Sequence, residues 1–297
     1  MDLSSTNLRV LRQVAESGSF TAAATHLGYT QSAVSRQAAA LERAAGRALF
    51  ERRPDGVRLT PAGLGLLRHG RAILDALDAA ERDLTGATPQ TSVVRLGLFL
   101  SAGAAVLPTV LTRLATTDPL IQVTTREGSS PGLVRALRAG SIDLAVLASR
   151  PPFRPPGEDT PHLHIDTLAD TELLLAAATT GQFAGRTSIH VDELADAAWI
   201  GTPSTVAEPL LGVWPGLPGR PRILHSTRDW LTKLHLVASG FGITTVPARL
   251  APLLPPGITL LRVDGTAPEL RRVLLARLPG RPTAGIRAVA RAVAEAI

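Results

Sequence analysis

The first part of the chain carries three stretches of helical periodicity separated by turn residues. Apolar residues within 8–15 recur every three or four positions, as they do on one face of a helix. A second helix is predicted over 19–27 and a third over 30–45, with Ser19 and Thr30 as their N-caps. Two short helices joined by a tight, glycine-containing turn predict a helix-turn-helix.

The third of these helices has a polar face that suits contact with nucleic acid bases. Ser32 and Arg36 lie opposite its apolar stripe, Ser35 flanks that face, and Gln31 stands in the first turn. Glutamine can pair with adenine and arginine with guanine through two hydrogen bonds, while serine can bond a base or a phosphate. A polar face that is only solvated is the alternative interpretation.

A turn signal, Pro54-Asp55-Gly56, separates two short extended segments after the third helix. This pattern predicts a β-hairpin, or wing, with Arg52, Arg53 and Arg58 around its tip. A basic hairpin beside a recognition helix can reach phosphates or a narrow minor groove, which adds to the case for nucleic acid binding.

A long helix is predicted to begin at Thr60-Pro61, with threonine as N-cap and proline at the first helical position. Its stripe ends at Gly86, and residues 87–91 are predicted to form a linker. The stripe fits a coiled-coil partner and a packed surface helix equally well. Its small and apolar members alternate spacings of four and three: Leu66, Gly70, Ile73, Leu77, Ala80 and Leu84.

From residue 92 onward, apolar stretches of strand length alternate with helical stretches, which predicts a parallel α/β architecture. Ligands of such sheets bind beyond the carboxyl ends of the strands. Hydroxyl residues follow several of these predicted strands, and we single out Ser101, Ser129 and Thr202. The helix N-termini beside them favour anions, whereas simple N-capping is the alternative role. Further helices are predicted near 191–197 and after Pro203.

Composition and charge refine this picture without deciding it. Of the 297 residues, 45% are hydrophobic and 19% are charged, as in globular proteins. The net charge of +6 arises from 31 basic and 25 acidic residues, and Lys233 is the only lysine among the basic ones. Arginine suits bidentate recognition of phosphate and guanine better than lysine does, although the basic excess is too small to imply nucleic acid binding alone.

Several classes of protein are disfavoured. No cysteine is present, which excludes disulfides and cysteine-ligated metals. The N-terminus lacks a secretory pattern, and the most membrane-like run, 173–178, is far shorter than a spanning helix, so we expect a cytoplasmic protein without a membrane partner. The histidines are dispersed, with His162 and His164 the one close pair, and Gly-x-Gly-x-x-Gly does not occur. Gly-x-Ser-x-Gly occurs once, at 128–132, and we expect no serine hydrolase from this single match. We therefore expect no catalytic residue, no metal and no cofactor.

One family pattern is matched in register by Gly18–Ala24, Leu27, Gln31–Gln37, Leu41-Glu42, Gly46, Leu49-Phe50, Arg52-Arg53, Leu59-Thr60 and Gly63. Through these matches, residues 3–67 closely resemble the DNA-binding half of LysR-type transcriptional regulators. This resemblance implies a winged helix-turn-helix, dimerisation through the long helix, groove contacts by Gln31, Ser35 and Arg36, and minor-groove or phosphate contacts by Arg52 and Arg53. The alanines around Gly46 depart from the bulkier apolar residues of the family pattern, which affects local packing.

The larger half resembles the effector domain of the same family, through looser matches at 140–146 and 239–247. That domain is a two-lobed α/β fold similar to periplasmic binding proteins. Carried over, the resemblance implies that Ser101, Ser129 and Thr202 hold an inducer between the lobes. It also implies that the chain leaves lobe one near residue 160 and returns to it near residue 266.

Sequence and resemblance together predict an α/β protein that regulates transcription. Three domains are expected: a winged helix-turn-helix over 1–60, a linker and dimerisation helix over 61–90, and an effector domain over 91–297. Within the effector domain, lobe one is expected at about 91–160 and 266–297, and lobe two at about 161–265. The partners expected are double-stranded operator DNA, a small-molecule effector and RNA polymerase. The chain is also expected to pair with further copies of itself through the 61–86 helix, as a homodimer or a homotetramer. The residues expected at DNA are Thr30, Gln31, Ser32, Ser35, Arg36, Arg52 and Arg53.

Two other hypotheses stay open. One is a regulator that acts without an effector. The other is a solute-binding or enzymatic α/β domain that carries a vestigial helix-turn-helix and acts without DNA. Binding to a specific DNA sequence in the presence of competitor DNA separates the second of these from the main hypothesis.

Overall fold

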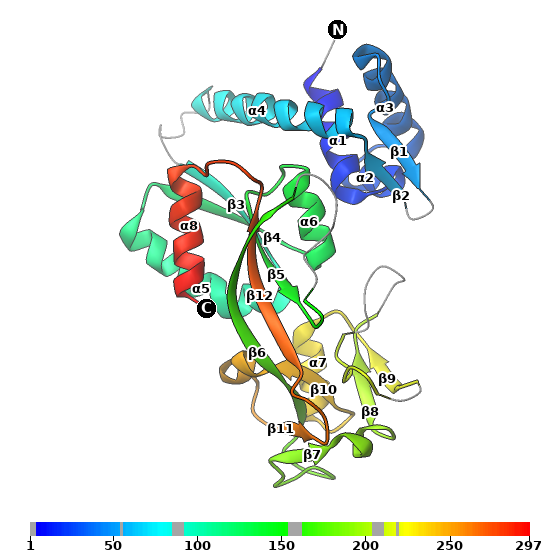
Figure 1. Ribbon diagram of the computed structural model, residues 1–297, viewed down its shortest axis with the longest axis vertical. Helices are drawn as coiled ribbons and strands as arrows, with labels where there is room; N and C mark the ends of the chain where they lie inside the picture. The colour runs from blue at the N-terminus through cyan, green and yellow to red at the C-terminus, as the bar shows by residue number, and fades with distance from the viewer. Residues whose placement is uncertain (1–3, 54–55, 85–91, 154–161, 204–210, 218–219) are drawn as a thin grey trace. The chain divides into compact units, whose positions relative to one another are not determined.

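The computed structural model of the chain describes residues 4–53, 56–84, 92–153, 162–203, 211–217 and 220–297. The chain divides into two compact units. The first unit comprises 1–147, 155–167 and 274–297, and the second comprises 148–154 and 168–273. Figure 1 labels the helices and strands of both.

The first unit begins with three helices whose ends follow local sequence signals (Figure 1): α1 (Ser5–Ser17), α2 (Phe20–Leu27) and α3 (Gln31–Ala45). The hydroxyls of their N-caps, Ser4, Ser19 and Thr30, accept hydrogen bonds from backbone N–H groups three residues ahead. Each helix ends at a glycine whose φ lies between 63° and 67°, a left-handed conformation that glycine adopts without strain. The predicted helix-turn-helix is confirmed as α2 and α3.

The predicted wing is present as an antiparallel hairpin of β1 (Phe50–Arg53) and β2 (Gly56–Leu59). The predicted tip at Pro54-Asp55 lies outside the described residues. The Val57 N–H donates a 2.8 Å hydrogen bond to the Gly18 carbonyl, which holds β2 against the turn between α1 and α2. Gly56 has a φ of 133°, and any side chain there would collide with the same carbonyl, so only glycine fits.

The apolar faces of these helices and the wing share one core. Phe20 and Phe50 pack with their ring centroids 5.5 Å apart, which joins α2 to the wing. This contact matters for function because it fixes the wing beside the helix-turn-helix. The buried members are Val10, Val14, Ala23, Ala24 and Val34, and Phe20, Leu27, Phe50 and Val57 pack against them.

Helix α4 (Pro61–Leu84) is the predicted long helix. Near its middle, a side chain at Gly70 would lie 2.9 Å from Leu8, so α4 approaches α1 closely there. Further along, Ile73 is 46% exposed and Leu77 is 39% exposed. The described part of the stripe is therefore packed at its start and uncovered beyond Gly70. The predicted linker over 87–91 lies outside the described residues.

The rest of the first unit has the predicted α/β alternation. Strand β3 pairs in parallel with both β4 and β5, and α5 lies beside α8 (Figure 1). Parallel pairing needs crossover connections, and the helices between the strands supply them. The elements are β3 (Ser92–Leu98), α5 (Leu100–Thr117), β4 (Ile121–Glu127), α6 (Ser130–Arg138), β5 (Leu144–Ser149) and α8 (Ala284–Glu295).

The second unit mixes parallel and antiparallel pairs. Strand β6 (His164–Ala178) pairs antiparallel with β10 (Thr244–Pro247) and β11 (Ile258–Asp264), and β11 pairs in parallel with β7 (Ser188–His190). Strand β8 (Ala198–Gly201) pairs in parallel with β9 (Arg222–Ser226). The remaining elements are helix α7 (Trp230–Ala238), strand β12 (Leu270–Arg277), which ends in the first unit, and two 3₁₀ helices, Val191–Leu194 and Ala248–Leu253.

One predicted helix of this unit is shorter than expected. The helix predicted over 191–197 is a single 3₁₀ turn, Val191–Leu194, with His190 and Glu193 forming a reciprocal capping box at its start. The predicted helix after Pro203 lies outside the described residues.

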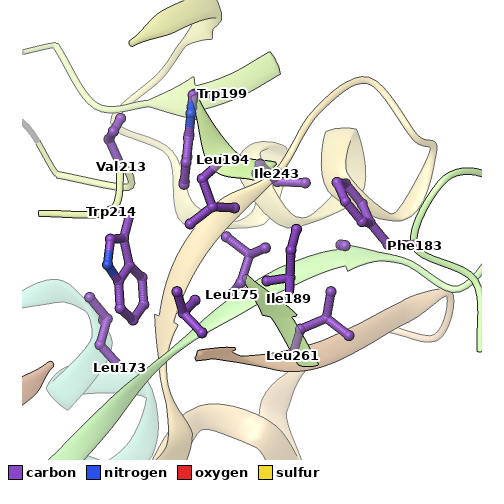
Figure 2. Close-up of a cluster of buried hydrophobic side chains, with 12 residues drawn as sticks. Leu173, Leu175, Phe183, Ile189, Leu194, Trp199, Val213, Trp214, Ile243 and Leu261 are labelled. Atoms are coloured by element: carbon purple, nitrogen blue, oxygen red, sulfur yellow. The ribbon is translucent and has the colours of Figure 1, made fainter. Parts of the chain in front are cut away.

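Figure 2 shows the core of the second unit, where the side chains of β6, β8 and β11 converge. Trp199 is fully buried and Trp214 is 4% exposed within this cluster. Both tryptophans therefore belong to the core of this unit. Because this core is closely packed, it holds the end of β8 and the residues that follow it in a fixed position.

Candidate functional site

The N-terminal half of α3 presents its polar side chains to solvent. Gln31, Ser32 and Arg36 are exposed, whereas Val34 on the opposite face is fully buried. The Gln31 amide donates a 2.9 Å hydrogen bond to the Ser35 hydroxyl, so two of the predicted base contacts are already linked. The Thr30 hydroxyl accepts from the Ala33 N–H at 3.2 Å and lies 3.1 Å from the Ser32 hydroxyl. The structure brings these predicted residues together on one exposed helix end.

The wing carries the other predicted contacts. Arg52 and Arg53 are both exposed, and both lie on β1. The Arg52 guanidinium lies 6.0 Å from the Phe20 ring centroid, a cation–π distance. Arg53 pairs with the Glu51 carboxylate at 3.0 Å, which partly neutralises its charge in the free protein. Of the two, Arg52 therefore offers the less compensated charge to a phosphate.

Sequence reasoning missed the residue that joins α3 to the wing. The Glu42 carboxylate accepts hydrogen bonds from the Leu49 N–H at 2.8 Å and the Phe50 N–H at 3.1 Å. It therefore fixes the first residue of β1 against the end of α3. Glu42 belongs to the family pattern, but the sequence does not reveal that its carboxylate accepts hydrogen bonds from two later backbone N–H groups.

Two of the predicted effector residues lie in the first unit. Strands β3 and β4 are in parallel register with Leu98 opposite Glu127, so the helices that follow them begin at the same edge of the sheet. Ser129 is the N-cap of α6 and accepts from the Gly132 N–H at 3.4 Å, which is the simple capping role. Ser101 lies in the first turn of α5, whose N-cap is Phe99, and its hydroxyl has no hydrogen-bond partner among the described residues. Ser101 is thus the freer of the two.

The third predicted effector residue, Thr202, lies in the second unit directly after β8. Its backbone N–H donates to the Leu211 carbonyl at 2.8 Å, and its hydroxyl accepts a 2.6 Å hydrogen bond from the Lys233 ammonium. Lys233 is 3% exposed, and burial lowers the pKa of its ammonium to about 8. Sequence reasoning noted this lysine only as the single one in the chain. An ionisable residue within the apolar stretch of α7 is the signal that could have found it.

Within the part of the chain that the structure describes, no group of three or more His, Asp or Glu side chains could hold a metal ion. Nor does any described helix have the length and apolarity needed to span a lipid bilayer.

A helix-turn-helix with an exposed polar helix end and a basic wing, joined to an α/β domain, defines a transcription regulator that binds DNA. Comparison with known families identifies the type. Residues 5–64 match the family of bacterial regulatory helix-turn-helix proteins of the LysR type, and residues 87–297 match the LysR substrate-binding domain. The chain belongs to the LysR family of transcriptional regulators, and the predicted family, fold class and function are confirmed.

A relative supports this assignment, and two solved structures share the fold. A probable hydrogen peroxide-inducible genes activator of Mycobacterium avium is 32% identical over 250 residues, covering 83% of this chain and 78% of the relative. Full-length CbnR in complex with its target DNA has a TM-score of 0.56 and 24% identity, covering 99% of this chain and all of CbnR. A cysteine-to-aspartate variant of full-length OxyR from Pseudomonas aeruginosa has a TM-score of 0.58 and 20% identity, covering 100% and 95%.

Proposed function

We propose that this regulator reads a specific operator sequence with the N-terminal half of α3. The observation that carries the proposal is the exposed set of Gln31, Ser32 and Arg36 at a capped helix end, with Ser35 hydrogen-bonded to Gln31. In a major groove, Arg36 pairs with a guanine edge and Gln31 with an adenine edge. The Thr30 and Ser32 hydroxyls bond nearby phosphates or base edges.

The wing adds affinity rather than sequence discrimination. Arg52 and Arg53 contact phosphates, where positive charge is favoured whatever the bases are, or enter a narrow minor groove. Glu42 keeps the wing in place while it does so, because it holds the start of β1 through two backbone hydrogen bonds.

The regulator acts as a homodimer or homotetramer that pairs through α4. Ile73 and Leu77 expose 46% and 39% of their surface in the single chain, and a second copy of α4 would cover them. A dimer with a two-fold axis places two recognition helices about 34 Å apart or a multiple of that, so the operator is an imperfect inverted repeat.

A small molecule controls the regulator, and Ser101, Ser129 and Thr202 are its proposed contacts. Ligand can change the regulator only if it binds two arrangements of the protein with different affinity. The M. avium relative is called peroxide-inducible, but this chain has no cysteine whose thiol an oxidant could convert. We therefore assign it an effector other than one sensed through a thiol.

The remaining parts of the proposal concern organisation and partners. The DNA-binding domain covers about 1–60, the dimerisation helix and linker 61–90, and the effector domain 91–297. The protein works in the cytoplasm on double-stranded DNA, makes contact with RNA polymerase at its promoters, and catalyses no reaction. Its membership of a family of regulators supports the last point.

Genomic-fragment selection with the purified full-length protein tests the proposed function. The selection is run at about 150 mM salt with excess random competitor DNA, since specific binding survives conditions that remove charge attraction. An enriched motif with inverted half-sites supports the proposal. Binding that disappears under competitor, with no motif, overturns it and favours a solute-binding domain with a vestigial helix-turn-helix.

A further inference from the structure

The second unit buries a cation. Lys233 lies in α7, four residues after the Asp229 N-cap, and only 3% of its surface is exposed. An ammonium group loses its hydration when it is buried, and this loss is costly unless an anion or several acceptors replace the water. The buried ammonium of Lys233 is therefore expected to have a compensating anion or several hydrogen-bond acceptors.

The surroundings of the ammonium are polar and closely built. The Thr202 hydroxyl accepts from it at 2.6 Å. A side chain at Gly212 would lie 2.9 Å from the Lys233 nitrogen and 2.8 Å from both the Thr244 hydroxyl and the Ile200 carbonyl oxygen. Gly212 also has a φ of 90°, so glycine is required there for its conformation and for the space it leaves.

The same cluster is held rigidly. The Thr244 hydroxyl is fully buried and lies 2.9 Å from the Ile200 carbonyl and 3.0 Å from the Gly212 carbonyl, so it joins the end of β8 to the start of β10. Thr202 follows β8 at its carboxyl end, the edge of a parallel pair at which ligands of α/β proteins bind. All of these residues belong to the second unit.

Within the described residues, no negatively charged group pairs with the Lys233 ammonium. None of their carboxylates lies within ion-pair distance of the Lys233 nitrogen, and burial is the sole cause of its lowered pKa. The ammonium has three N–H donors, of which Thr202 accepts one. What the cluster lacks is an acceptor group that carries negative charge.

We propose that Lys233 and Thr202 form a subsite that binds a carboxylate group of the effector. One ammonium and one hydroxyl match a group with a single charge and two oxygens, whereas phosphate sites in proteins use several N–H donors and often arginine. This inference rests on the proposed function in one respect, namely that the ligand is the regulator's effector. The subsite itself does not depend on DNA binding.

The single lysine makes a direct test available. Full-length protein labelled with ¹³C,¹⁵N-lysine gives the NMR signals of Lys233 and of no other side-chain ammonium. Acetate, succinate, benzoate and their neutral amides are titrated separately at equal ionic strength, with inorganic phosphate as a further arm. We expect a saturable shift of the Lys233 signal with at least one of the acids, and a rise of its pKa above about 8, because a bound anion favours the charged amine.

Three results of the NMR titration overturn the proposal. The first is a Lys233 signal that none of the acids moves. The second is an equal response to the amides or a stronger one to phosphate. The third is a fall of the Lys233 pKa in the Glu208→Gln variant. Glu208 lies outside the described residues, and such a fall would mean that its carboxylate, rather than that of a ligand, pairs with Lys233.

Matched variants locate the binding. Lys233→Met weakens binding of the responding acid by at least about tenfold, because a charge-assisted hydrogen bond is lost. Arg222→Gln removes an exposed positive charge from the same unit and leaves the affinity unchanged. Equal affinity in wild type and Lys233→Met contradicts the assignment.

The outcomes for subsite and function are separable. If a carboxylate binds at Lys233 but no DNA motif is enriched, the proposed subsite is supported and the proposed operator reading is contradicted. If a motif is enriched but no carboxylate affects Lys233, the proposed operator reading is supported and the proposed subsite is contradicted.

Discussion

Replacement of Lys233 by methionine is expected to stabilise the second unit at neutral pH. Burial lowers the pKa of this ammonium from 10.5 to about 8. Each pKa unit corresponds to about 1.4 kcal/mol, so at pH 7 the folded state bears a penalty of about 3 kcal/mol for keeping the charge. Methionine has a similar length, fills the same space without charge, and loses the Thr202 hydrogen bond, which is worth about 2 kcal/mol because its donor is charged. The expected net gain is about 1 kcal/mol.

The sign of the pH dependence follows from the direction of the shift. The folded pKa lies below the unfolded one, so between about pH 8 and pH 10.5 the unfolded state binds a proton that the folded state has released. Wild-type stability therefore rises with pH across this window, and the penalty is fully present below pH 8. The advantage of Lys233→Met should disappear by about pH 10, because most of the charging penalty is then gone.

Denaturant unfolding followed by tryptophan fluorescence measures this effect. Trp199, Trp214 and Trp230 all lie in the second unit, so the signal reports the unfolding of that unit. Arg222→Gln is the control for loss of an exposed charge and should leave the midpoint within experimental error. A methionine variant no more stable than wild type at pH 7, or one whose gain is the same at pH 7 and pH 10, would refute the reasoning.

Three further changes test other parts of the account. Arg52→Ala should weaken binding to operator and random DNA alike, and a salt titration should show that the slope of log affinity against log salt decreases by about one. A loss of affinity confined to the operator would contradict a phosphate contact. Glu42→Ala leaves the N–H groups at the start of β1 unpaired and should cost about 2 kcal/mol in thermal unfolding of the DNA-binding domain, and an unchanged midpoint would deny it that role. Ile73→Ser with Leu77→Ser should shift the protein toward monomer in sedimentation, whereas an unaltered oligomer would exclude this part of α4 from the interface.

The sequence predicts the DNA-binding domain well because its determinants are local. Ser19 and Thr30 cap the helices that they were expected to cap, and the turn signal before β2 corresponds to the observed hairpin. N-caps, glycine stops and turns act over three to five residues, so they can be recognised without knowledge of the fold. The helix predicted over 191–197 was wrong in length, since a capping box fixes its start but a continuing apolar stripe is lacking.

The ligand chemistry was harder to predict because it depends on contacts distant in the chain. Thr202 was selected from its position after a strand, but its partner Lys233 lies 31 residues later. Ser129 caps its helix, which leaves its effector role a prediction, while Ser101 does not cap its helix. Glu42 likewise acts on backbone groups seven and eight residues away. Periodicity places a residue on a face, and it does not say which atom that residue meets.

The most direct test of the central claim is the ratio of affinities for the selected operator and for random DNA, measured for wild type, Arg36→Ala and Arg43→Ala. Arg43 is an exposed arginine two turns further along α3 and serves as the charge control. If α3 reads bases, Arg36→Ala loses about 1–3 kcal/mol on the operator and relaxes the preference at one base position, while Arg43→Ala loses equally on both DNAs. Equal loss on operator and random DNA for Arg36→Ala would contradict sequence reading by this helix.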